Sequence, residues 1–138
     1  MKRFLVFIIF IMAFSLTVNA QVSVIVNKSV SEASVDAAKL KDIYSLKTTK
    51  WGDGSKIVVF NLKAKGAVQD KFYNHLGVKI SNLKKTWMKA QLTGEGTAPK
   101  SLGSETDVLQ KVSSTPGAVG FVGSGKVTNA VKVVSAVK

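Results

Sequence analysis

Apolar positions along the chain repeat with two periods, two residues in some segments and three to four in others. Alternation and β-branched residues predict strands at 22–29 and 130–137, and short apolar runs predict strands at 57–62 and 118–122. The longer period predicts helices at 35–47, 68–76, 82–92 and 105–114. Strands that alternate with helices favour an α/β domain with a mixed or largely parallel sheet.

Polar residues at the boundaries suggest how these helices begin. Ser34 is expected to cap the first helix and Ser81 the third, while Ser104 and Asp107 have the spacing of a capping box for the fourth. The stretch at 93–103 is rich in Gly and Thr and is expected to be a loop.

The N-terminal segment, residues 1–20, has the organisation of a secretory signal peptide. Two basic residues precede an apolar run from Phe4 to Phe14, and Val18 and Ala20 occupy the −3 and −1 positions of a cleavage site. The run is shorter than the roughly 20 residues of a membrane span. We therefore expect cleavage after Ala20, a single domain at 21–138, no stable membrane anchor, and a periplasmic or secreted location.

The chain is strongly basic and has no cysteine. Lys2 and Arg3 of its 20 basic residues belong to the predicted signal peptide, which leaves 18 lysines against 8 acidic residues and a net charge of +10. Lysine attracts anions diffusely, whereas arginine suits bidentate recognition. The charge indicates either a surface that gathers anions or one that serves solubility. The missing cysteines exclude disulfides and thiolate metal or redox sites.

Residues 120–127, GFVGSGKV, come close to a phosphate-binding P-loop. Gly120, Gly125 and Lys126 fit that pattern, but Val127 stands where a magnesium-binding Ser or Thr belongs. The residues after Lys126 alternate as in a strand, so no helix is expected to begin at the lysine. We interpret residues 123–125 as the start of a connection between two strands, not as a nucleotide site.

A series of short motifs occurs in an order that resembles the phosphate-binding proteins of phosphate ABC transporters. They are Ile43-Tyr44, Lys47, Trp51, Asp53-Gly54, Phe72, Trp87, Gly94, Gly96, Pro99 and PGAVGFV at 116–122. The match covers nearly all of residues 21–138, and PGAVGFV is its most specific part. Proteins of that family have two lobes and about twice this length. The resemblance implies one lobe of a type II periplasmic-binding-protein-like fold, with a mixed or mostly parallel sheet flanked by helices.

The resemblance also implies an anion site. After the strand that matches IVVFNL, the family has an arginine and then Ser-Gly-Thr at a helix N-terminus, where amides, hydroxyls and a cation replace the hydration of phosphate. In this chain Lys63 or Lys65 takes the place of the arginine, and Gly66 and Ala67 replace the hydroxyl-bearing residues. The expected site is Lys63, Lys65 and the amides of Gly66, Ala67 and Val68. The alternative is a helix start with solvated lysines.

Other candidate residues point to structure more than to chemistry. His75 is expected on a helix surface, and the scattered acidic residues suggest neither a metal site nor a catalytic pair. The aromatic residues interleave with lysines, as in nucleic-acid binding, but their spacing favours a core. The segment 82–92 can be read as a basic amphipathic helix on a membrane surface, although packing of Trp87 into the fold is favoured.

These observations together predict a non-catalytic, exported binding domain without a cofactor. Its expected ligand is phosphate or a similar oxyanion, and no nucleic-acid partner is expected. Because one lobe cannot enclose a ligand, a second copy or an envelope protein is expected to close the site. The alternative function is a degenerate lobe that acts as a module for binding envelope proteins or polyanions.

Overall fold

The computed structural model describes residues 21–137, so the predicted signal peptide at 1–20 lies outside the described residues. The elements are β1 (Val22–Val26), α1 (Ala37–Tyr44), β2 (Val58–Leu62), α2 (Ala67–Leu76), α3 (Ile80–Thr93), β3 (Lys100–Leu102), α4 (Glu105–Ser114), β4 (Ala118–Gly123), the 3-10 turn η1 (Ser124–Lys126) and β5 (Lys132–Val137). No helix within the described residues has the length and apolar character needed to cross a bilayer.

The strands form one mixed sheet in the order β3-β2-β4-β1-β5, which confirms the predicted fold class. β2 runs parallel to β3 and to β4, whereas β1 runs antiparallel to its neighbours β4 and β5. Val22, at the start of β1, pairs with Gly123 at the end of β4 and with Val137 at the end of β5. The two ends of the described chain therefore lie together at one edge of the sheet.

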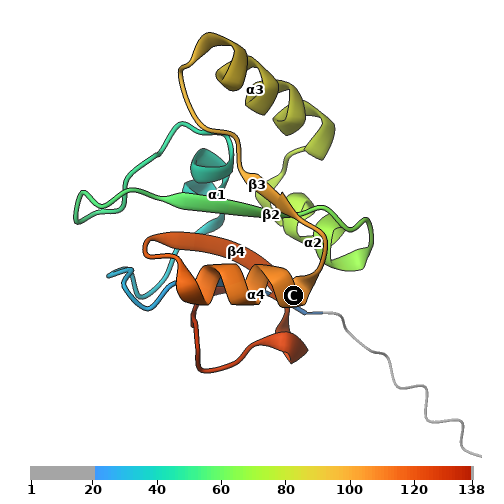
Figure 1. Ribbon diagram of the computed structural model, residues 1–138. Helices are drawn as coiled ribbons and strands as arrows, with labels where there is room; N and C mark the ends of the chain where they lie inside the picture. The colour runs from blue at the N-terminus through green and yellow to red at the C-terminus, as the bar shows by residue number, and fades with distance from the viewer. Residues whose placement is uncertain (1–20, 138) are drawn as a thin grey trace, which may run out of the picture.

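Helices cover both faces of the sheet (Figure 1). Successive residues of a strand point to opposite faces, and β4 shows this at Gly120 and Phe121. Phe121 stacks on Phe72 of α2 with ring centroids 3.9 Å apart. A methyl group at Gly120 would lie 2.8 Å from Val108 of α4. Glycine at position 120 therefore allows α4 to pack directly on the sheet, opposite α1 and α2.

The aromatic residues lie in the core, as their spacing predicts. Tyr44, Phe72 and Phe121 are fully buried, and Trp51 and Trp87 are nearly so. Both indole nitrogens donate to backbone carbonyls, Trp51 Nε1 to Gly117 over 2.9 Å and Trp87 Nε1 to Tyr44 over 2.6 Å. Rings buried in this way cannot stack on the bases of a nucleic acid.

Two predicted caps are wrong and one is confirmed. Asp36, not Ser34, caps α1, since its carboxylate accepts the Lys39 N–H over 2.8 Å. Helix α3 begins at Ile80, so Ser81 lies inside its first turn and does not cap it. Ser104 caps α4 and accepts the Asp107 N–H over 3.1 Å, as predicted.

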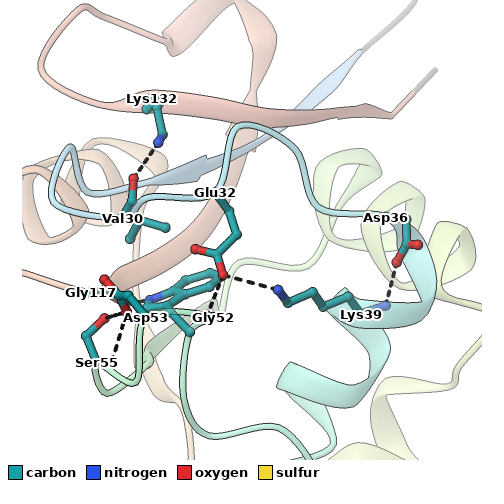
Figure 2. A network of polar contacts seen from close by, with 10 residues as sticks. Val30, Glu32, Asp36, Lys39, Gly52, Asp53, Ser55, Gly117 and Lys132 are labelled. Carbon is teal, nitrogen blue, oxygen red and sulfur yellow. Dashed lines mark hydrogen bonds and ion pairs between the residues drawn. The ribbon is translucent and has the colours of Figure 1, made fainter.

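A polar network at the edge where β2 begins fixes the loop before α1 (Figure 2). Glu32 Oε1 accepts the Gly52 N–H over 2.7 Å and the Lys39 ammonium over 3.2 Å. Burial of the carboxyl opposes its ionisation, but these two donors outweigh burial and hold the pKa of Glu32 below its usual 4.5. The ionised carboxylate thereby ties the N-terminal loop to the turn before β2.

Candidate functional site

The three parallel strands β2, β3 and β4 end at the same edge of the sheet. The segments that follow them are 63–66, 103–104 and 124–126, and we call this region the carboxyl edge. The Lys63 N–H donates to the Leu102 carbonyl over 2.8 Å, which joins the first two segments. Ligands of open α/β sheets bind outside the carboxyl ends of the strands. The topology therefore points to the carboxyl edge as the place for a binding site.

The residues predicted to bind an anion come together here at the start of α2. Gly66 is the N-cap and no side chain caps the helix. The first helical bond in the turn joins the Asp70 N–H to the Gly66 carbonyl, so the amides of residues 67–69 precede the helical ladder. Lys63, Lys65, Gly66 and Ala67 are exposed and Val68 is half-buried. The N-terminus of α2 can thus offer free amides and two ammonium groups to an anion.

Gly66 has a backbone conformation that other residues rarely adopt. Its φ is 155° and its ψ is −169°, a region that is essentially confined to glycine. A methyl group there would meet no atom within 4 Å, so the conformation and not crowding requires glycine. This turn directs the chain from β2 into α2 at the carboxyl edge.

Buried polar side chains fix the end of β2 beneath the site. Asn61 accepts from the Tyr73 hydroxyl over 2.5 Å and donates to Ser101 over 3.2 Å. Gln69 donates to the Leu62 carbonyl over 3.0 Å. Burial raises the pKa of Tyr73 far above its usual value, so its hydroxyl remains a donor. These bonds hold the connection between β2 and α2 in one position, which favours a preorganised site.

Glu105 brings a negative charge to the same edge. Its Oε1 accepts the Gly123 N–H over 2.5 Å. A methyl group at Gly123 would lie 2.9 Å from this oxygen and 3.8 Å from the Val68 side chain. The carboxylate therefore lies close to Val68, where its negative charge would repel a bound anion. The exposed Asp70 in the first turn of α2 adds a second negative charge.

Sequence reasoning found the start of α2 but missed its neighbours. Glu105 is 37 residues from Val68 along the chain, and the two come together because both lie beside Gly123 at the end of β4. Asn61 and Gln69 were also missed. A signal for them existed in the sequence, since each is an amide side chain next to the predicted apolar positions of a strand or a helix.

The other candidate residues from the sequence, the P-loop-like stretch and His75, belong to ordinary elements of the fold. Gly120 and Gly123 belong to β4, η1 follows, and β5 is the next element, so no α-helix begins at Lys126. The stretch does connect β4 to β5 as interpreted, but the connection begins at Ser124, since Gly123 is still part of β4. His75 is exposed near the end of α2, as predicted. Among residues 21–137 no three His, Cys, Asp or Glu side chains gather as metal ligands.

A hollow lies at the end of β2 opposite the predicted anion site. It has a volume of about 500 Å³, and its apolar lining residues include Val58, Val59 and Leu46. Lysines 56, 100 and 111 are among its other lining residues, and none of the lining residues is acidic. It shares no residue with the predicted anion site.

Comparison with known proteins identifies the fold. Neither a protein-family model nor a curated protein sequence matches the chain. Solved structures do match it, among them a candidate phosphate ABC transporter substrate-binding protein of Clostridium perfringens that was solved with bound phosphate. It has a TM-score of 0.68 and 20% identity, over 83% of this chain and 45% of that one.

Two further solved structures match the chain over a similar share of its length. An ABC-type phosphate transport receptor of Vibrio cholerae matches with a TM-score of 0.66, 20% identity and coverage of 83% of this chain and 47% of its own. PstS of Borrelia burgdorferi matches with a TM-score of 0.61, 20% identity and coverage of 84% and 47%. The chain thus has the fold of one lobe of such proteins and spans less than half of their length. The resemblance inferred from the sequence motifs is confirmed at the level of the fold.

Proposed function

We propose that this chain is a non-catalytic binding domain that takes up phosphate or a similar oxyanion at the start of α2. The ligand would contact Lys63 and Lys65 and the amides of Gly66, Ala67 and Val68. The observation that carries the proposal is the uncapped N-terminus of α2 beside two exposed lysines at the carboxyl edge. The fold supports it, because one matching structure was solved with bound phosphate.

The chemistry of the site sets its expected strength. Free amides and a helix dipole favour an anion, and each ammonium adds a charge-assisted hydrogen bond. The site lacks the hydroxyls of Ser-Gly-Thr, is open on one side, and has Glu105 nearby. We therefore expect binding that is saturable but weaker than that of a two-lobed protein.

Calorimetric titration of residues 21–138 with phosphate, and with sulfate for comparison, tests the proposal at low and moderate salt. The double variant Lys63→Gln/Lys65→Gln should weaken phosphate binding by about tenfold or more, because it removes two charge-assisted bonds. The matched control is Lys28→Gln/Lys50→Gln, which removes the same charge from exposed positions near the opposite edge of the sheet. The control should bind like the parent.

Two outcomes would contradict the proposal. One is the absence of binding, and the other is a heat that sulfate shares equally, that salt abolishes, and that both double variants lower to the same extent. The second outcome is the behaviour of a diffuse positive charge and not of a site.

We also propose that the chain is exported, with cleavage after Ala20. The proposal rests on the apolar run Phe4–Phe14 and the small residue at position 20. N-terminal sequencing of the chain recovered from a cell envelope or medium should begin at Gln21. A chain that retains Met1 in the cytoplasm would contradict it.

A further inference from the structure

The surface of α3 combines features that the proposed anion site does not use. Figure 1 shows α3 at the top of the molecule, apart from the other helices. Only Leu83 and Trp87 of this helix are buried. They fix one side of α3 to the body of the domain, and the opposite side faces outward.

That outward side carries two large apolar residues. Met88 is 62% exposed and Leu92 is 82% exposed. They are four residues apart, so they lie on the same side of the helix, one turn from each other. Together with Val133 they are the large apolar residues that stand out as exposed among residues 21–137.

Lysines surround this apolar pair. At 100° per residue Lys85 lies in the same row as Met88 and Leu92, while Lys84 and Lys89 lie on either side of the row. All three are exposed. The helix contains no acidic residue from Ile80 to Thr93.

We propose that this face of α3 adsorbs reversibly to an anionic membrane surface. The two apolar side chains would enter the boundary between headgroups and acyl chains, and the lysines would contact the anionic headgroups. A single convex helix with charges on both sides of a short apolar row fits a broad negative surface. Two exposed apolar side chains are few for a stable protein interface, which buries about 800 Å² on each partner.

The sequence suggested two roles for residues 82–92, a membrane-surface helix and packing of Trp87 into the core. In the structure these two roles use different sides of α3. Trp87 faces inward and bonds to the Tyr44 carbonyl, whereas Met88 and Leu92 face outward. The outward side of α3 can therefore contact a membrane without any loss of core packing.

Co-sedimentation with vesicles of phosphatidylcholine, with and without phosphatidylglycerol, tests the proposal. Residues 21–138 are used because they contain every element of the fold and lack the apolar run Phe4–Phe14, which would itself bind vesicles. The variant Met88→Gln/Leu92→Gln keeps the charge and should lower the partition coefficient on anionic vesicles by about fivefold or more. The variant Lys84→Gln/Lys85→Gln/Lys89→Gln should lower it by about a hundredfold, since each lysine near the surface contributes about fivefold.

Matched controls separate this face from the charge of the whole protein. Lys28→Gln/Lys50→Gln/Lys111→Gln removes the same charge from other exposed positions, and Val133→Gln replaces an exposed apolar residue on β5. Both should bind clearly better than the corresponding α3 variants. Leu92→Trp should strengthen binding, because tryptophan favours the membrane interface. Circular dichroism verifies that each variant is folded.

Equal effects of the α3 variants and their controls would overturn the proposal, because adsorption would then depend on total charge alone. Absence of binding to anionic vesicles, or binding of the same strength to neutral ones, would also overturn it. None of these results bears on phosphate binding at α2.

Discussion

Glu105 is the residue that most directly limits the proposed anion site. Its carboxylate accepts a hydrogen bond from the Gly123 amide close to Val68. A phosphate bound at the start of α2 would therefore lie near another negative charge. The site is therefore a compromise between a helix N-terminus that attracts an anion and a carboxylate that repels one.

The variant Glu105→Gln should bind phosphate more tightly than the parent. The amide oxygen of glutamine can still accept the Gly123 N–H, so the loop geometry is retained while the negative charge is lost. An increase in affinity of about three- to tenfold is expected, corresponding to about 1 kcal/mol for a partly exposed charge pair. Calorimetry measures it, with Glu95→Gln, an exposed acid beyond α3, as the control. Unchanged affinity would mean that the ligand does not bind near Val68.

Glu32 gives a prediction on stability. Its pKa is below the ordinary 4.5, so its contribution to folding is present above about pH 4.5 and is lost as the pH falls through the pKa of the folded state. Glu32→Gln should lower the free energy of unfolding by about 1–2 kcal/mol at neutral pH, because it removes a charged partner of Lys39 and a charge-assisted bond to Gly52.

Urea unfolding of the parent and of Glu32→Gln at neutral pH and at about pH 3 tests this. The difference between the two proteins should shrink on acidification, because protonation of the Glu32 carboxylate removes the charge that distinguishes the parent from the variant. A difference that stays constant with pH would show that shape and not charge is responsible.

At the scale of elements, α3 depends on very few contacts. Leu83 and Trp87 are its buried residues, and the Trp87 indole adds a bond of 2.6 Å to the end of α1. A helix with so small a buried face is expected to open locally without unfolding of the sheet.

The variant Trp87→Ala should therefore detach α3 from the domain while the sheet remains folded. Loss of a buried tryptophan costs about 3–5 kcal/mol, and it leaves α3 held mainly by Leu83 and the half-buried Ile80. Amide hydrogen exchange should show loss of protection over Ile80–Thr93 while β1 and β4 remain protected. Leu92→Ala, at an exposed position of the same helix, is the control and should change little. Global unfolding of Trp87→Ala would contradict the prediction.

The elements also show what the sequence could predict. The apolar stretches gave β1, β2, β4 and β5 to within a few residues, because each contains buried apolar residues, many of them β-branched. β3 was expected to be loop: its three residues are Lys, Ser and Leu, and they form a strand only because they pair with β2. The start of α2 was found through Gly66, whereas Glu105 was missed because its place depends on a contact with Gly123, 18 residues away, that the apolar pattern does not reveal.

At the scale of the whole molecule, the chain covers less than half of each matching phosphate-binding structure. The ends of the described chain meet at the carboxyl edge, since Val22 pairs with both Gly123 and Val137. The N-terminus of α2 lies at this same edge. A second body placed against the carboxyl edge would therefore cover the proposed site.

A second copy of the chain could provide that body, but two copies repel each other, since residues 21–138 carry a net charge of +10. An anion held between two carboxyl edges would reduce this repulsion. We therefore predict a monomer in the absence of phosphate and an increase in dimer as phosphate is added, which sedimentation velocity measures. Lys63→Gln/Lys65→Gln should remain monomeric, and the Lys28→Gln/Lys50→Gln control should dimerise as the parent does. A parent protein that stays monomeric with and without phosphate would exclude pairing with itself, and closure would then require a different protein.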